Sequence, residues 1–285
     1  MESKIHLVEC PRDAMQGWPG FISTQEKAEY INALLKVGFD TIDFGSFVSP
    51  KAIPQMADTA EVLAKLHIYN SRSKLLAIVA NQRGAEEAAQ FDEITCLGFP
   101  FSVSPTFQQR NTNSTIEDSL VTVQHIRQLC LAKNKELVIY ISMGFGNPYG
   151  DIYNEDIVLQ WVEKLIALDI KIISLADTVG VAQPAQVSSI LKSLIPKYPQ
   201  IEFGVHLHST PANRENKINA ALAAGCKRFD GALKGIGGCP MAGDELTGNV
   251  DSEWLIAFLE NKALLPVLDK AALQEALIMA TRIFR

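Results

Sequence analysis

Short runs of β-forming residues alternate with amphipathic helical segments along the whole chain of 285 residues. Eight such runs can be counted, and most of them precede a segment in which apolar residues recur at helical spacing. Eight β–α units in fewer than about 300 residues are typical of a (β/α)8 TIM barrel, which is the fold that we predict. The predicted strands are 5–9, 41–44, 75–80, 93–97, 137–143, 171–176, 201–207 and 228–232.

The alternating pattern is not interrupted by a linker, a low-complexity stretch or a strong internal repeat. We therefore predict one catalytic TIM-barrel domain over residues 1–285, with one further amphipathic helix over 269–284. Helix start signals support individual assignments. Ser114 and Glu117 have the spacing of a capping box at the start of the helix predicted over 115–132.

Composition limits the classes of function that need to be considered. The formal net charge is −6 and no basic tract offsets it, which argues against nucleic-acid binding. No apolar run approaches the roughly 20 residues that a membrane span requires. A strand predicted almost at the N-terminus leaves no room for a leader peptide, and the five cysteines lack zinc or disulfide spacing. These features favour a reduced cytoplasmic location.

Polar side chains follow the predicted strands at the end where TIM barrels carry their chemistry. The first strand leads into Arg12 and Asp13, and the seventh ends in His206 and His208. We expect these groups to meet at one mouth of the barrel. The other polar residues at predicted strand ends are Asp43, Ser46, Ser49, Asp177, Thr178, Cys239 and Asn249.

The two histidines are separated by one residue in a predicted strand, so both imidazoles should face the same side. Such a pair can be a hydrogen-bonded pair in a core or two ligands of a metal ion. Asp13 and Asn249 would add a carboxylate and an amide oxygen at the same mouth. This donor set suits Mg²⁺ or Mn²⁺ better than zinc, and we predict a divalent metal site of Asp13, His206, His208 and Asn249.

Other residues have both a structural and a functional interpretation. Arg12 either forms an ion pair with Asp13 or stabilises an oxyanion. Cys239, in a Gly-Gly-Cys-Pro turn, is either an inert thiol or a thiol that a flexible loop carries to a substrate. Asp177 has the position of a cap for the next helix, and a structural role is favoured for it over direct catalysis.

These residues, in this order, resemble the hydroxymethylglutaryl-CoA lyase family of metal-dependent carbon–carbon lyase barrels. The resemblance covers nearly the whole chain, and the stretches that carry it are PRDAMQ, SFVSPK, FQQRNTNSTIEDS, SLADTVGV, VHLHST and GGCP. It implies metal ligands at Asp13, His206, His208 and Asn249. It also implies catalytic roles for Arg12, Asp13, Asp43, Asp177 and Cys239.

The activity that the resemblance implies is retro-Claisen cleavage of 3-hydroxy-3-methylglutaryl-CoA to acetoacetate and acetyl-CoA, assisted by Mg²⁺ or Mn²⁺. Asp13 would take the hydroxyl proton, Arg12 would stabilise the enolate oxygen, and Cys239 would protonate the carbon. The same resemblance implies an acyl-CoA substrate, a homodimer, and a setting such as leucine degradation or ketone-body formation.

Some positions depart from the family pattern. Asp43 stands where a glutamate is usual, so its contact to Arg12 or to a metal-bound water is expected to be longer, and Ser209 replaces an aspartate. One alternative is a Claisen-condensing synthase of the isopropylmalate, citramalate or homocitrate type, although Cys239 stands where those enzymes usually have a glutamate. Another is a metal-binding barrel without catalysis.

Overall fold

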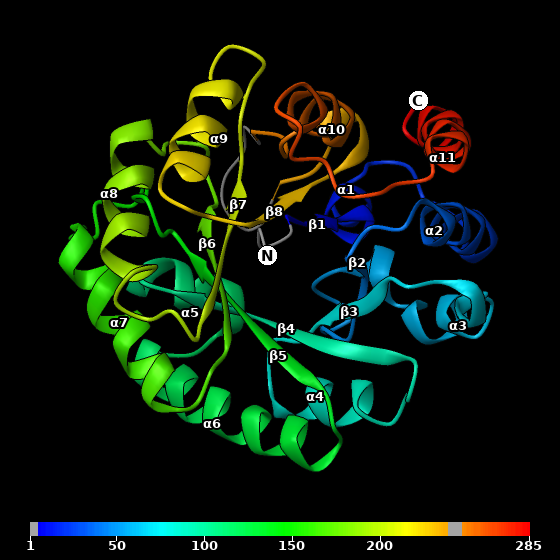
Figure 1. Cartoon of the computed structure of the whole chain (residues 1–285). Helices are drawn as coiled ribbons and strands as arrows, with labels where there is room; N and C mark the ends of the chain where they lie inside the picture. Colours follow the sequence, from blue (N-terminus) through cyan, green and yellow to red (C-terminus); the bar gives the residue numbers. More distant parts are fainter. Residues whose placement is uncertain (1–4, 239–246) are drawn as a thin grey trace.

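The computed structural model describes residues 5–238 and 247–285. Eight parallel strands close into one barrel in chain order, with helices around the outside (Figure 1), which confirms the predicted (β/α)8 fold. Pairing of β1 with β8 closes the barrel. The strands are β1 (His6–Glu9), β2 (Thr41–Ser46), β3 (Lys74–Ile78), β4 (Ile94–Ser102), β5 (Glu136–Ser142), β6 (Ile172–Asp177), β7 (Glu202–Leu207) and β8 (Arg228–Gly231).

Helices connect and cover these strands, and the last of them packs against α2. The α-helices of the described residues are α1 (Pro11–Gln16), α2 (Thr24–Val37), α3 (Thr59–Leu63), α4 (Gln82–Ala88), α5 (Pro105–Thr112), α6 (Ile116–Ala132), α7 (Glu155–Ala167), α8 (Pro184–Leu194), α9 (Arg214–Ala223), α10 (Ser252–Asn261) and α11 (Lys270–Ile283). Short 3-10 turns are η1 (Pro54–Met56), η2 (Ile68–Asn70) and η3 (Leu233–Gly235). In the described part of the chain, no helix combines the length and apolar composition that crossing a bilayer requires.

The capping box predicted at the start of α6 is wrong by one residue. Thr115 is the cap, because its hydroxyl accepts a hydrogen bond from the backbone N–H of Asp118 at 3.0 Å. The Ser114 hydroxyl instead donates to the carbonyl of Thr115 at 3.1 Å. Adjacent hydroxyl residues offer two overlapping capping patterns, and the backbone conformation selects the second.

Alternation along the strands divides the apolar residues between two clusters. Leu75 and Ala77 of β3 belong to the large cluster beneath the helices. Leu76, between them, belongs to a small cluster with Cys96, Val138 and Tyr140. Because successive strand residues face opposite sides, the small cluster lies in the barrel interior.

Glu9 is a buried carboxyl group that joins β1 to the segment following β8. Its two oxygens contact the backbone N–H of Leu233, at 2.8 Å, and the hydroxyl of Ser252, at 2.5 Å. Burial raises the pKa of Glu9 to about 8. The side chain is therefore mostly protonated at neutral pH, which allows it to lie inside without a cationic partner.

Replacing Glu9 with glutamine is expected to flatten the pH dependence of stability between about pH 4.5 and 8. The unfolded carboxyl group loses its proton near pH 4.5, whereas the folded one keeps it until about pH 8. The unfolded state therefore binds fewer protons in this window, so stability falls as the pH rises. Glutamine removes this loss, which is on the order of a few kcal/mol.

Thermal unfolding midpoints of both proteins, measured at intervals from pH 5 to pH 8, test this expectation. The unfolding midpoint of the variant should rise steadily relative to that of the wild type as the pH rises. Glu253, whose pKa burial raises to about 7, also acts electrostatically on Glu9, so making both measurements in a Glu253→Gln background removes its contribution from the difference. A constant difference across the range would contradict the assignment.

Candidate active site

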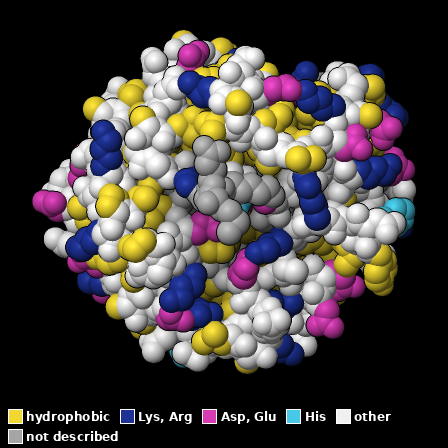
Figure 2. All heavy atoms as spheres, in the orientation of Figure 1, with side chains coloured by type: hydrophobic (Ala, Val, Ile, Leu, Met, Phe, Trp, Pro, Cys, Tyr) yellow, Lys and Arg dark blue, Asp and Glu magenta, His cyan; other side chains and the backbone are white. Residues whose placement is uncertain are grey.

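A cavity of about 360 Å³ opens among the carboxyl ends of the strands. Its polar side chains include Arg12, Asp13, His206 and His208, and its walls are largely apolar, as at Ile78. On the face seen in Figure 2, basic, acidic and apolar side chains are intermixed. The cavity, by contrast, gathers charged and imidazole groups in one place.

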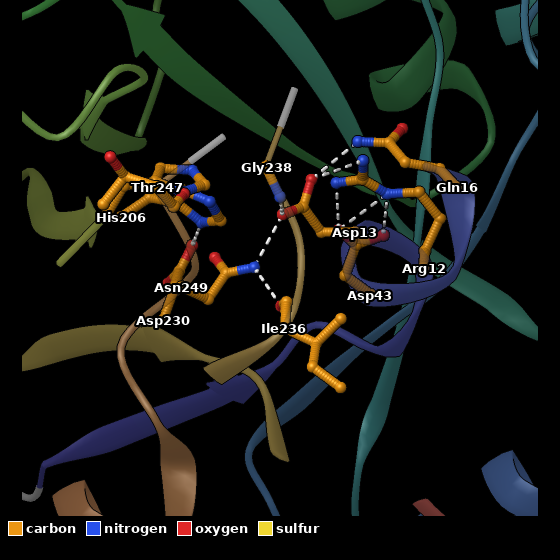
Figure 3. A network of polar contacts seen from close by, with 11 residues as sticks. Arg12, Asp13, Gln16, Asp43, His206, Asp230, Ile236, Gly238, Thr247 and Asn249 are labelled. Atoms are coloured by element: carbon orange, nitrogen blue, oxygen red, sulfur yellow. Dashed lines mark hydrogen bonds and ion pairs between the residues drawn. The ribbon is translucent and has the colours of Figure 1, made fainter. Parts of the chain in front are cut away.

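Arg12 is held in place by two carboxylates (Figure 3). Helix α1 begins at Pro11 directly after β1, which places Arg12 and Asp13 beside the end of β2. The Nε atom of Arg12 lies 3.1 and 3.0 Å from the two Asp43 oxygens, and its Nη2 atom lies 2.5 Å from Oδ2. Asp43 therefore contacts Arg12 directly, despite its shorter side chain.

The carboxylates of Asp43 and Asp13 stabilise the charged form of Arg12. Burial disfavours the charged guanidinium, but Asp43 and Asp13 outweigh it and raise the pKa of Arg12 above its ordinary value. Burial also raises the pKa of Asp43, despite the opposing effect of Arg12. Arg12 is consequently a permanent positive charge at the cavity wall, oriented by two separate contacts.

Asp13 is the central acceptor of the site. Its Oδ1 atom accepts hydrogen bonds from Arg12 Nη1, at 3.1 Å, and Gln16 Nε2, at 2.8 Å. Its Oδ2 atom accepts from Asn249 Nδ2, at 2.7 Å, and from the backbone of Gly238, at 3.2 Å. Burial would raise its pKa, but Arg12 and the two histidines lower the pKa of Asp13 to about 2, so it is ionised.

The two histidine rings lie together, as strand alternation predicts, with centroids 5.2 Å apart. His206 Nδ1 lies 3.1 Å from Asp230 Oδ2, and His208 Nδ1 lies 2.7 Å from the carbonyl oxygen of Thr247. Burial lowers the pKa of His208, and the neighbouring His206 lowers it further. His206 behaves oppositely, because Asp230 and Asp13 outweigh burial and raise its pKa.

The donor set fits a divalent cation. Asp13, His206 and His208 each offer a ligand atom within 4.8 Å of the others, and all three are buried. Asn249 lies beside His208 through a β-bridge. Its Nδ2 atom is used by Asp13 and by the carbonyl of Ile236, which leaves the amide oxygen as its ligand atom. Mixed nitrogen and oxygen donors of this kind suit Mg²⁺ or Mn²⁺.

Gly237 permits the close approach that this arrangement needs. A Cβ atom there would lie 2.7 Å from Asp13 Oδ2 and still closer to Asn249 Nδ2. The φ angle of Gly237 is +122°, a conformation that L side chains rarely adopt. Any larger residue would therefore push the loop away from the two side chains that its backbone contacts.

Cys10 lies close to His206 and Asp230, and these three residues form a second buried group of metal-ligating type. Burial and the nearby carboxylates hold the pKa of Cys10 well above its usual value. The thiol is therefore protonated, and a protonated thiol is a poor metal ligand. Packing, as interpreted from the sequence, accounts for Cys10.

Asp177 ends β6 but does not cap the next helix, because the residue at the start of α8 is Gln183. Instead, Asp177 Oδ1 accepts a hydrogen bond from the backbone of Ala182, and Oδ2 lies 2.7 Å from Lys217 Nζ. Lys217 is buried and also donates to the carbonyl of His208, at 2.9 Å. The two residues thus join the ends of β6 and β7 behind the histidines.

The sequence predicted most of the residues of this site, but it did not indicate Gln16, Asp230 or Lys217. Gln16 stands three residues after Asp13 on α1, a spacing that could have indicated its contact. Asp230 and Lys217 gave no local signal. Cys239, the predicted acid, lies outside the described residues, so its role stays a prediction.

Comparison with known proteins adds independent information. The family described as HMGL-like matches residues 5–279. The hydroxymethylglutaryl-CoA lyase YngG of Bacillus subtilis is 34% identical over 90% of this chain and 85% of its own. The (R)-citramalyl-CoA lyase of Chloroflexus aurantiacus is 29% identical over 96% of this chain and 88% of its own.

A solved structure shows the same fold. The HMG-CoA lyase from Acenitobacter baumannii, in complex with coenzyme A and 3-methylmalate, superposes with a TM-score of 0.91 at 30% sequence identity. The match covers 99% of this chain and 91% of that one. The similarity therefore extends over the barrel and its helices, not only over the short motifs.

Proposed function

Because the chain belongs to the HMGL-like family, we propose that this lyase cleaves 3-hydroxy-3-methylglutaryl-CoA into acetoacetate and acetyl-CoA. The observation that carries the proposal is the meeting of Arg12 with Asp13, His206 and His208 in one buried cavity. A permanent cation beside a mixed carboxylate and imidazole ligand set is what cleavage to an enolate requires.

Asp13, His206, His208 and Asn249 would hold the divalent cation, which acts as a Lewis acid toward the substrate hydroxyl and carboxylate when bound. Asp13 is the proposed acceptor of the hydroxyl proton. With a pKa of about 2, it can accept that proton only from a hydroxyl whose own pKa has been lowered.

Bond cleavage turns the alcohol carbon into the ketone of acetoacetate and leaves the electron pair on the thioester as an enolate. Arg12 is the proposed partner of the enolate oxygen, because its guanidinium is charged, buried and fixed by two carboxylates. The thiol of Cys239 is the proposed donor of the proton that converts the enolate carbon to the methyl group of acetyl-CoA.

Acetoacetate release from 3-hydroxy-3-methylglutaryl-CoA tests the function. The protein is first stripped with a chelator and then assayed without metal, with Mg²⁺ and with Mn²⁺. We expect release only with metal, because the carboxylate and imidazole groups of the site do not polarise the hydroxyl by themselves. Metal-independent release, or none while bound metal is detected, would contradict the proposal.

Two comparison assays separate the remaining alternatives. Release of pyruvate from citramalyl-CoA in preference to acetoacetate would identify a different acyl chain for the same lyase site. Condensation of acetyl-CoA with a 2-keto acid would identify a synthase.

The family resemblance also supports a cytoplasmic homodimer that serves leucine degradation or ketone-body formation. Sedimentation velocity tests the dimer.

A further inference from the structure

Asp230 lies in β8 and, among the described residues, hydrogen-bonds through its side chain to His206 of the site. Its Oδ2 atom is 3.1 Å from His206 Nδ1, and its side chain is completely buried. His206 lines the cavity, whereas Asp230 is not among the described residues that do so. Figure 3 shows Asp230 on the side of the histidine and asparagine cluster opposite Arg12 and Asp13.

We propose that Asp230 is a positioning residue that fixes the tautomer and the orientation of His206, so that Nε2 is its ligand atom for the divalent cation. This inference rests on the proposed function. A neutral imidazole carries one N–H group and one lone pair. A carboxylate at Nδ1 accepts the N–H, so the lone pair is at Nε2, and the hydrogen bond also makes the ring a stronger donor to a metal.

Among the described residues, the hydrogen bond of the Asp230 side chain is the one to His206. Its other oxygen, Oδ1, has no hydrogen-bond partner in the described part of the chain. Arg228, two residues earlier and therefore on the same side of β8, supplies a buried positive charge nearby. That arginine hydrogen-bonds Glu202 instead, through Nη1 at 3.1 Å. The rings of Tyr140 and His206 pack in a T-shaped arrangement, with centroids 5.8 Å apart.

The second histidine is supported differently. His208 Nδ1 faces a backbone carbonyl, at Thr247, rather than a carboxylate. A neutral carbonyl selects the same tautomer but polarises the ring less than a full negative charge does. The support of His206 therefore comes from a side chain, Asp230, which can be replaced without changing a residue that lines the cavity.

The chain also contains a matched control. Glu202 Oε1 lies 3.1 Å from His6 Nδ1, the same distance as in the Asp230 and His206 pair. His6 is at the start of β1, away from the cavity. Replacing His6 with glutamine breaks this histidine–carboxylate contact and leaves the hydrogen bond between Glu202 and Arg228 in place, away from the proposed metal site.

The experiment compares wild type, Asp230→Asn and His6→Gln. Mn²⁺ affinity is measured from the electron paramagnetic resonance signal of free Mn²⁺ and by calorimetry. Histidine tautomers are read from long-range ¹H–¹⁵N correlation spectra of the metal-free protein, at a pH high enough that the His206 ring is neutral. We expect Asp230→Asn to weaken Mn²⁺ binding by about 10- to 100-fold and His6→Gln to bind as wild type does. In wild type, His206 should carry its proton on Nδ1.

The outcomes separate this inference from the proposed function. Absence of Mn²⁺ binding by wild type would overturn both. Wild-type affinity in Asp230→Asn, or equal weakening in His6→Gln, would overturn the role of Asp230 alone. The wild-type spectrum decides the matter even if Asp230→Asn fails to fold, because a neutral His206 ring protonated on Nε2 alone would overturn the inference.

Discussion

Replacing Arg12 with lysine is expected to lower kcat by about 100-fold or more, because the variant loses the fixed positive charge proposed to stabilise the enolate. Lysine keeps one charge but cannot reproduce the contacts that Arg12 makes with Asp43 and Asp13 together. Its ammonium group would pair with one carboxylate and leave the enolate oxygen without a directed donor. Mn²⁺ affinity should change far less than kcat, since all four proposed ligands remain.

The control for this variant is Arg127→Lys. Arg127 also makes two contacts with one partner, the carbonyl and the carboxylate of Asp169, but on the outside of the barrel. Its replacement should leave kcat, KM and Mn²⁺ affinity unchanged. A normal kcat in Arg12→Lys would mean that charge alone, without the geometry of the guanidinium, is sufficient for the reaction.

Replacing His208 with alanine is expected to weaken Mn²⁺ binding by more than about 100-fold. Loss of a group that only supports a ligand costs about 10- to 100-fold, and His208 is a proposed ligand itself. Calorimetric titration of the metal-free variant measures the effect. Activity should return partly at high Mn²⁺ concentration, because occupancy follows mass action.

His125→Ala is the matched control, since His125 is exposed and contacts only Gln82 among the hydrogen bonds of the described residues. It should bind Mn²⁺ as the wild type does. If His208→Ala also keeps the wild-type affinity, His208 is not a ligand, and its neighbour His206 would have to act with Asp13 and Asn249 alone.

The meeting of Asp13, His206 and His208 could be predicted from the sequence because it depends on topology rather than on detail. Parallel strands of a barrel bring all their carboxyl ends to one mouth, so polar residues at strand ends meet even where strand boundaries are uncertain. The same reasoning placed Asn249 and Asp43 near the cluster. Their actual contacts agree with that placement.

The supporting residues could not be predicted, because their partners are distant in the chain. Lys217 looks like a solvated residue of an amphipathic helix, and only the packing of α9 places it against Asp177. Asp230 looks like an ordinary polar residue in a short strand. Its function depends on the pairing of β7 with β8, which sets it beside His206. Local pattern carries no information about such pairs.

The closure of the barrel by β1 and β8 also sets the order in which the enzyme can be completed during its synthesis. Asp13 leaves the ribosome with the first β–α unit, but the histidines and Asn249 follow only with the last two. A nascent chain that has folded most of its strands still has no pocket for the cation. The proposed metal site therefore cannot be completed before Asn249 has been synthesised, when only α10 and α11 remain.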